Sequence, residues 1–438
     1  MQRYEKYKPS EVEWLGNIPA HWDVHSLRAV TTLKSDKNKP ELPVLSVYRE
    51  YGVILKDSRD DNHNATSLDT STYKVVKPGD LVVNKMKAWQ GSMGVSAYEG
   101  IVSPAYITCA TRADRVRPAY LHYLLRSSPL IGVYNSLSYG VRVGQWDMHY
   151  EDFKQIPIPL PPRTEQDRIV AFLNHKTTEI NAAILKKERL IDLLIQKKEI
   201  NINQVMASGL DPKVILKDTG LLHTKKMPAH WVIRKVKHVS LISPSRTLDG
   251  RRRTSEKVCF LPMDKIGDDG TVNVEDQRVA NEVFEGFTYF RRDDVVVAKI
   301  TPCFENGKGA WLKDLPTEYG FGTTELHVIR PKKIFGDFLF RLLNRKDFLN
   351  EGQEFMVGSA GQKRLPISFL ANYMFACPPV EEQIKICSWI SELCAQTEAL
   401  VRAERDAILH LKELKQVLIA SAVTGKMEVV RDYYGQSN

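Results

Sequence analysis

The chain has 438 residues, of which 43% are apolar and 26% charged, and its formal net charge at pH 7 is +9. This length exceeds what one hydrophobic core usually organises, so two or more domains are expected, and the composition excludes wholesale disorder. A basic chain favours a polyanionic partner, because each Lys or Arg placed against a phosphate releases condensed counterions. The absence of an apolar signal core and of about 20 consecutive apolar residues predicts a cytoplasmic protein without membrane contact.

Two short motifs occur twice along the chain. IPAHW at 18–22 returns as MPAHW at 227–231, and LPPRTEQ at 160–166 returns as CPPVEEQ at 377–383. The order and common spacing of these motifs predict an internal repeat with pseudo-two-fold symmetry. The centres of the two copies have diverged from each other.

Each copy begins with a mixed, strand-rich segment, at residues 1–162 and 210–380. DLVVNKM at 80–86 and DVVVAKI at 294–300 are short β-branched runs behind an acidic turn residue. Such runs are typical of strands, and their positions predict that they occupy equivalent places in two mixed α/β domains.

A long amphipathic helix is predicted after each strand-rich segment, over 163–209 and over 381–425, and 426–438 is predicted as a tail. Apolar residues follow each Pro-Pro pair at intervals of three, four or seven. Roughly 44 residues form a rod of about 65 Å, which is too long to bury its apolar stripe alone. We therefore expect an antiparallel coiled coil with one mixed domain at each end, in an α+β fold. A helix on a membrane surface is disfavoured, because Glu and Lys alternate on the polar face.

Signatures of catalysis and of metal binding are not found. The sequence has no GxxxxGK[ST] loop, no GxGxxG after a strand, no HExxH and no GxSxG. A base-flipping amino-methyltransferase has Asn or Asp immediately before its two prolines, but the two Pro-Pro pairs of this chain follow Leu160 and Cys377. The six cysteines form no CxxC pair and are predicted to be reduced core thiols. The repetition of His21 and His230, each before a Trp, favours a structural role over metal binding.

The repeated motifs and the two helices together resemble the specificity subunits of type I restriction-modification systems, over nearly the whole chain. The resemblance implies two target-recognition domains, each reading one half of a bipartite, asymmetric DNA target, while the helices set the spacer and dock two methylation subunits. It also implies two ATP-dependent restriction subunits. No cofactor is expected on this chain, because S-adenosylmethionine, ATP and magnesium would be bound by the partners. His223 stands where the first copy has Trp14, which puts only the packing of the second domain in doubt.

Loops with basic, amide and aromatic side chains are the candidates for DNA contact, because phosphate contacts set the register and base edges carry the sequence information. The candidates in the first domain are Asn84, Lys85, Lys87, Trp89, Gln90, Tyr139, Arg142 and Gln145. The candidates in the second domain are Arg251, Arg252, Arg253, Lys299, Thr301, Asn306, Lys308, Ser359, Gln362, Lys363 and Arg364. The alternative interpretation is that these side chains are solvated and bind nothing, and that Trp89 belongs to the hydrophobic core.

Two other functions stay open at this point. One is a stand-alone DNA-modifying enzyme, against which the missing catalytic motifs count. The other is a coiled-coil scaffold that binds no DNA, against which the basic charge and the divergent centres of the two copies count. The neighbouring genes would discriminate between them, because a reader subunit should lie beside a gene for a separate adenine methyltransferase.

Overall fold

The structure is a computed structural model that describes residues 2–58, 69–140, 146–221, 224–247, 250, 254–359 and 361–430. The chain divides into two compact units, each of them mixed α/β. Unit 1 consists of Met1–Arg189 and Glu404–Asn438, and unit 2 of Leu190–Ala403. Each unit therefore includes a part of both long helices, and the domain boundaries expected from the sequence stay a prediction.

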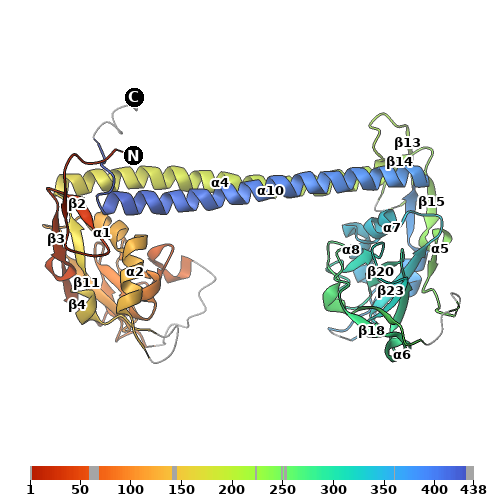
Figure 1. Cartoon of the computed structure of the whole chain (residues 1–438), viewed down its shortest axis with the longest axis horizontal. Helices are drawn as coiled ribbons and strands as arrows, with labels where there is room; N and C mark the ends of the chain where they lie inside the picture. Colours follow the sequence, from red (N-terminus) through yellow and green to blue (C-terminus); the bar gives the residue numbers. More distant parts are fainter. Residues whose placement is uncertain are drawn as a thin grey trace. The chain divides into compact units, whose positions relative to one another are not determined.

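The two long helices are α4 (Arg163–Ser208) and α10 (Val380–Val423), as the apolar spacing predicts (Figure 1). Both follow a Pro-Pro pair, and both end before a glycine with positive φ. Gly209 at φ +76° and Gly425 at φ +72° adopt the left-handed conformation that commonly terminates a helix. Among the described residues, no helix is both long enough and apolar enough to cross a membrane.

Within unit 1 the beginning of α4 packs against the end of α10. Ile169 and Leu173 share one hydrophobic core with Ile419 and Val423. The core continues past α10 into Met427, so part of the segment predicted as a tail is packed into the unit. Burial of these apolar side chains gives each helix the partner that its stripe requires.

Polar contacts extend the pairing of the two helices within unit 1. Lys187 Nζ lies 2.8 Å from the Glu404 carboxylate, and Lys415 Nζ donates to Asn181 Oδ1 at 2.9 Å. Later residues of α4 thus meet earlier residues of α10, so the two segments run antiparallel in this unit. Within unit 2, Val205 near the end of α4 shares a core with Ile386 near the start of α10.

The central sheet of unit 1 is antiparallel and has the strand order β4-β11-β8-β9, with α1 and α2 beside it (Figure 1). The shorter sheets are β1-β2, β12-β3, β5-β6 and β10-β7. The strands of this unit are β1 (Tyr7–Pro9), β2 (Asn17–Pro19), β3 (Asp23–Ser26), β4 (Thr31–Lys34), β5 (Leu45–Tyr48), β6 (Gly52–Leu55), β7 (Lys74–Val76), β8 (Leu81–Asn84), β9 (Met93–Val95), β10 (Gly100–Val102), β11 (Tyr106–Thr111) and β12 (Pro157–Leu160). Its shorter helices are α1 (Pro118–Leu125), α2 (Ser128–Leu137) and α3 (Tyr150–Phe153), with 3₁₀ turns η1 (Leu27–Ala29), η2 (Lys56–Ser58) and η3 (Lys85–Gln90).

Unit 2 has an antiparallel sheet of order β16-β23-β20-β21 and a second sheet of order β18-β17-β22-β19, in which β17 and β22 are parallel. The two-stranded sheets are β13-β14 and β15-β24. The strands are β13 (Leu216–Asp218), β14 (Lys226–Pro228), β15 (Val232–Lys235), β16 (Ser240–Ile242), β17 (Lys257–Leu261), β18 (Gln277–Val279), β19 (Thr288–Arg291), β20 (Val295–Ala298), β21 (Gly309–Trp311), β22 (Tyr319–Gly322), β23 (Leu326–Pro331) and β24 (Met374–Cys377). The shorter helices are α5 (Val236–Val239), α6 (Ala280–Val283), α7 (Gly336–Leu343), α8 (Lys346–Phe355) and α9 (Ile367–Asn372), with the 3₁₀ turn η4 (Met263–Lys265).

The runs DLVV and DVVV form β8 and β20, as predicted, and both strands are buried. In front of each strand the acidic residue closes a tight turn. The Asp80 carboxylate accepts the Lys77 amide N–H at 2.7 Å, and the Asp294 carboxylate accepts the Arg291 amide N–H at 2.9 Å. This bond explains why an acidic side chain precedes a fully buried strand in both units.

The repeated motifs contact each other inside each unit. His21 Nε2 lies 2.8 Å from Glu165 Oε2 in unit 1, and His230 Nε2 lies 2.8 Å from Glu382 Oε2 in unit 2. These bonds join the strand-rich part of each unit to the start of a long helix. The histidine of each repeated motif therefore has a structural role, which accounts for its occurrence in both copies.

A buried glutamine next to each of these glutamates completes the joint. The Gln166 amide donates to the Pro161 carbonyl and the Gln383 amide to the Pro378 carbonyl, both at 2.8 Å. Their side-chain oxygens accept the backbone N–H groups that precede α1 and α7, at 2.7 and 2.8 Å. Both glutamines have no exposed surface, so these hydrogen bonds satisfy groups that water cannot reach.

The six cysteines are free thiols, and four of them are buried as the sequence predicts. Cys303 and Cys394 are only half-buried, because one lies in a loop after β20 and the other on the partly exposed helix α10.

Candidate nucleic-acid interface

The first predicted loop of unit 1 follows the buried strand β8 and forms the turn η3. Gly91, at φ +84°, ends this turn with its N–H bonded to the Ala88 carbonyl. Lys87 is exposed on the turn, Gln90 is half-buried, and Asn84 at the end of the strand has only 8% of its surface exposed. Lys87 is therefore the candidate of this turn that is best placed to reach a phosphate.

The second predicted loop of unit 1 contacts the first one. Lys85 Nζ forms an ion pair with Asp147 at 3.1 Å, and the Lys85 carbonyl accepts the Met148 N–H at 2.9 Å. Trp89 packs edge-to-face on Trp146 with their ring centroids 5.3 Å apart. The structure thus brings together two segments that are about 60 residues apart in the sequence. Arg142 and Gln145 lie outside the described residues.

Tyr139 presents an aromatic face beside these loops. Its ring stacks on His149 at a centroid distance of 4.8 Å and an interplanar angle of 15°, and 58% of the residue is exposed. Its backbone pairs with Asp147, which also holds Lys85. A flat ring supported on one face and open on the other is suited to stacking or apolar contact with a base or sugar.

Two predicted loops of unit 2 are joined in the same manner. The Thr301 N–H donates to the Lys363 carbonyl at 3.0 Å, and the Lys363 N–H donates to Thr301 Oγ1 at 3.1 Å. The Leu365 N–H also donates to the Lys299 carbonyl at 2.7 Å. These bonds attach the loop before α9 to the segment that leaves β20.

The side chains of these unit 2 loops differ in their availability. Asn306, Ser359, Gln362 and Lys363 are exposed, whereas Lys308 Nζ donates to the Met263 carbonyl at 3.1 Å. Arg251, Arg252 and Arg253 lie outside the described residues. The exposed members offer ammonium, hydroxyl and amide groups to a ligand.

Arg364 is exposed, but a carboxylate already holds its guanidinium. Two hydrogen bonds of 2.8 Å join Arg364 to Glu325 in a bidentate pair. These bonds lower the pKa of Glu325 and raise that of Arg364. A phosphate would have to compete with this carboxylate, so Arg364 is less available than Lys363.

Several residues of this interface were not among the sequence candidates. Trp146, Asp147 and Glu325 organise the candidate side chains. Met86, which follows Lys85, and Phe355 at the end of α8 are exposed apolar residues, at 56% and 53%. Trp146 adjoins the candidate Gln145 and could have been found from that position. The carboxylates gave no such signal, because only basic, amide, hydroxyl and aromatic side chains were candidates for DNA contact.

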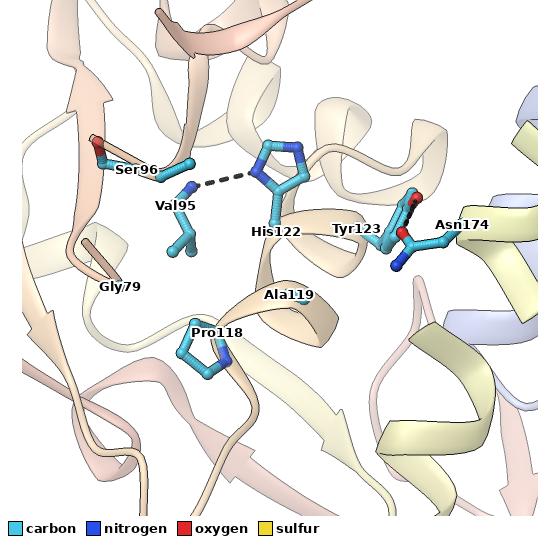
Figure 2. A pocket seen from close by; sticks show the side chains of 9 residues that line it. Gly79, Val95, Ser96, Pro118, Ala119, His122, Tyr123 and Asn174 are labelled. Carbon is cyan, nitrogen blue, oxygen red and sulfur yellow. Dashed lines mark hydrogen bonds between the residues drawn. The ribbon is translucent and has the colours of Figure 1, made fainter. Parts of the chain in front are cut away.

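A cavity of about 410 Å³ lies in unit 1 between α1, the end of β9 and α4. Figure 2 shows His122 and Tyr123 on neighbouring positions of α1. The His122 ring accepts the Val95 N–H at Nδ1 at 3.2 Å, and the Tyr123 hydroxyl donates to Asn174 Oδ1 at 2.8 Å. The second bond ties α1 to the long helix. Among the described residues, no group of three His, Cys, Asp or Glu side chains is arranged to hold a metal ion.

The stability of unit 1 is expected to fall in mild acid because of His122. Burial, together with the charge of Arg126, lowers the pKa of His122 to about 4. Between pH 6.5 and 4 the unfolded chain binds a proton that the folded chain excludes, so this contribution is lost as the pH falls. His122→Asn keeps a hydrogen-bond acceptor but has no titrating ring. Between pH 7 and pH 5 we therefore expect its free energy of unfolding to fall by about 2 kcal/mol less than that of the wild type. Urea unfolding of both proteins at the two pH values measures this, and equal losses in both would contradict the role of His122.

Comparisons with known proteins agree on one family. No family model matches the chain. Two specificity subunits from Escherichia coli match part of it: that of the type I restriction enzyme EcoEI is 34% identical over 200 residues, and that of EcoAI is 36% identical over 198 residues. These matches cover 45% and 43% of this chain. They cover 33% and 32% of the two relatives, so the chain matches about a third of their length.

More distant similarities extend over nearly the whole chain. The specificity subunit of the type I restriction enzyme StySPI from Salmonella potsdam is 20% identical, over 94% of this chain and 90% of that relative. A chain from a structure concerned with assembly and conformational transition of the type I R-M system superposes with a TM-score of 0.66 and 17% identity, over 94% of this chain and 99% of the other. The HsdS subunit of Thermoanaerobacter tengcongensis superposes with a TM-score of 0.55 and 19% identity, over 94% and 98%. The chain is thus similar in sequence to specificity subunits of type I restriction enzymes, and it shares the fold of the HsdS subunit.

Proposed function

We propose that the chain reads DNA for a type I restriction-modification complex, with each unit contacting one half of a bipartite, asymmetric target. The observation that carries this proposal is the pair of joined loops beyond the central strand of each unit. Their exposed ammonium, amide, hydroxyl and aromatic groups are the groups that contact phosphates and base edges. Lys87 and Tyr139 supply them in unit 1, and Gln362 and Lys363 supply them in unit 2.

We further infer that the two units are copies of one framework related by a pseudo-two-fold axis, and that α4 and α10 pair as an antiparallel coiled coil. The matching His–Glu and Gln–carbonyl bonds of the two units support the first part. The shared cores and the Lys187–Glu404 ion pair support the second. In this proposal the helices set the spacer between the half-sites and dock two methylation subunits.

We propose that this chain supplies recognition without chemistry and acts in the cytoplasm, where its DNA target lies. Two methylation subunits would bring S-adenosylmethionine, and two restriction subunits would bring ATP and magnesium. The names of the relatives as specificity subunits, and the neighbour from a study of complex assembly, support this division of labour. A scaffold without DNA binding would leave the exposed basic loops of both units without a task.

Selection from random duplexes tests the proposal. The chain, assembled with its methylation subunits, should enrich duplexes that carry two short half-sites separated by a spacer of constant length. Each half-site should depend on one unit, so Lys87→Ala should weaken selection through unit 1 while both motif halves remain readable. Enrichment of one continuous motif, or of none, would contradict a bipartite reader.

A further inference from the structure

A basic cleft in unit 2 lies outside the loops described above. It has a volume of about 290 Å³ and is lined by His230, Arg234, His238 and Lys333, together with Cys377 and the two prolines before α10. The loops proposed above to read DNA, here called the reading loops, follow β20 and precede α9 in unit 2. This cleft is instead formed by β15, α5, the segment after β23 and the start of α10. Different elements therefore build the two features.

The fold holds these basic groups together from three distant parts of the sequence. β15, which carries Arg234, pairs with β24, which leads into the Pro-Pro pair. The Val239 carbonyl at the end of α5 accepts the N–H groups of both Lys332 and Lys333 at 2.9 Å. These two hydrogen bonds fix Lys333 beside the short helix α5, which ends just after His238.

The charges of this cleft are largely uncompensated. His230 bonds the Glu382 carboxylate at 2.8 Å. For Arg234 and Lys333, by contrast, no ion pair is formed with any carboxylate in the described ranges, and both side chains are exposed. Lys332, which precedes Lys333, is exposed as well. Because neither Arg234 nor Lys333 has an acidic partner among the described residues, these two charges raise the local potential and attract an anion.

Unit 1 has a corresponding backbone contact but fewer basic side chains at the equivalent positions. There the Val30 carbonyl accepts the Arg112 N–H at 2.8 Å, as Val239 does for Lys332. Counted from the repeated His-Trp, however, His25 stands where unit 2 has Arg234, and Ala29 stands where it has His238. The framework therefore does not need Arg234 or His238 in order to fold, which leaves these two side chains available for a ligand.

We propose that this cleft binds the phosphodiester backbone of duplex DNA outside the recognised target. Guanidinium and ammonium groups match phosphate oxygens, and a cleft of this volume accommodates a phosphate with its sugar. Several basic groups in one cleft suit a polyanion with regularly spaced charges better than a single small anion. The proposal rests on the proposed function, because it requires that unit 2 already lies on DNA through its reading loops.

The test compares two duplexes that carry the selected target, one with minimal flanks and one extended by about 15 base pairs on each side. Arg234→Gln/Lys333→Gln removes two charges from the cleft. Lys213→Gln/Lys257→Gln is the matched control, because it removes two charges from exposed lysines elsewhere in unit 2. Affinity for both duplexes is measured by fluorescence anisotropy across a salt series, with the chain assembled as in the selection experiment. Circular dichroism melting of each variant verifies that the exposed substitutions leave the fold intact.

For the cleft variant we expect affinity for the long duplex to fall roughly 5- to 20-fold, and its salt slope to decrease by about 1.8, which corresponds to two phosphate contacts. Affinity for the short duplex and that of the control variant should stay at the wild-type level. Equal affinity of wild type and cleft variant for the long duplex overturns the proposal. Heat of binding for inorganic phosphate that disappears in the cleft variant, with unchanged DNA affinity, would assign the cleft to a free phosphate compound instead.

Two further results would overturn the inference in distinguishable ways. If the cleft variant binds both duplexes normally but no longer assembles with the methylation subunits, the cleft receives an acidic protein segment. If wild type itself does not distinguish the target from a scrambled duplex, the proposed function fails and this inference fails with it.

Discussion

Asp294→Ala is expected to destabilise unit 2 by about 3 to 5 kcal/mol, the largest stability effect among these predictions. The Asp294 carboxylate has no exposed surface and accepts two hydrogen bonds from Arg330, at 2.8 and 3.0 Å. It also accepts the Arg291 N–H that closes the turn before β20. Removal of the carboxylate leaves a nearly buried guanidinium without its partner, which costs far more than the pair itself contributes.

Hydrogen exchange measured by mass spectrometry separates this effect from changes in unit 1. Peptides from β20 and β23 should lose protection in Asp294→Ala, while those from β8 and β11 should not change. Asp314→Ala is the matched control, since this carboxylate is exposed and lies 3.7 Å from Lys313, and a change below about 0.5 kcal/mol is expected. The double variant Asp294→Leu/Arg330→Met should recover much of the loss, because apolar side chains replace the pair. Full protection in Asp294→Ala would show that the pair is dispensable.

Lys87→Ala/Lys363→Ala is expected to lower affinity for the target duplex about 10- to 100-fold and to reduce the salt slope by about 1.8. One exposed ammonium would be lost from the reading loops of each unit. Lys85→Ala should also weaken binding, but less than Lys87→Ala, because Lys85 already pairs with Asp147 at 3.1 Å. Titrations at several salt concentrations give both the affinity and the slope.

Arg364→Ala is the sharpest control for this prediction. Its charge equals that of Lys363 and it adjoins that residue, but Glu325 holds its guanidinium. We expect a smaller loss of DNA affinity than for Lys363→Ala, and no comparable change in salt slope. A loss that exceeds that of Lys363→Ala would mean that Arg364 leaves Glu325 to contact DNA.

The elements with a strong local signal could be predicted from the sequence. The apolar spacing after each Pro-Pro pair locates α4 and α10, and the acidic turn followed by three β-branched or apolar residues locates β8 and β20. Each of these patterns is contained in neighbouring residues of the sequence, so it can be recognised without knowledge of contacts between distant segments.

The remaining features depend on contacts between distant segments. The parallel pairing of β17 with β22 joins residues about 60 positions apart, and no periodicity announces it. The pairing of Lys85 with Asp147 and of Arg364 with Glu325 decides which candidate cations are free, and it emerges only when the loops meet. The basic cleft of unit 2 likewise assembles from three separate segments. Residue type was therefore enough to select candidates for DNA contact. Which of them are free of other partners could be seen only in the structure.

A genome-wide map of adenine methylation in the host, before and after deletion of this gene, tests the central claim most directly. We predict that methylation disappears from one bipartite, asymmetric motif with a constant spacer and persists at all other motifs. Restoring the gene with substitutions in one pair of reading loops should weaken methylation at that same motif. A map in which every methylated motif survives the deletion, although the methylation subunits are present, would contradict the assignment of this chain as the DNA reader.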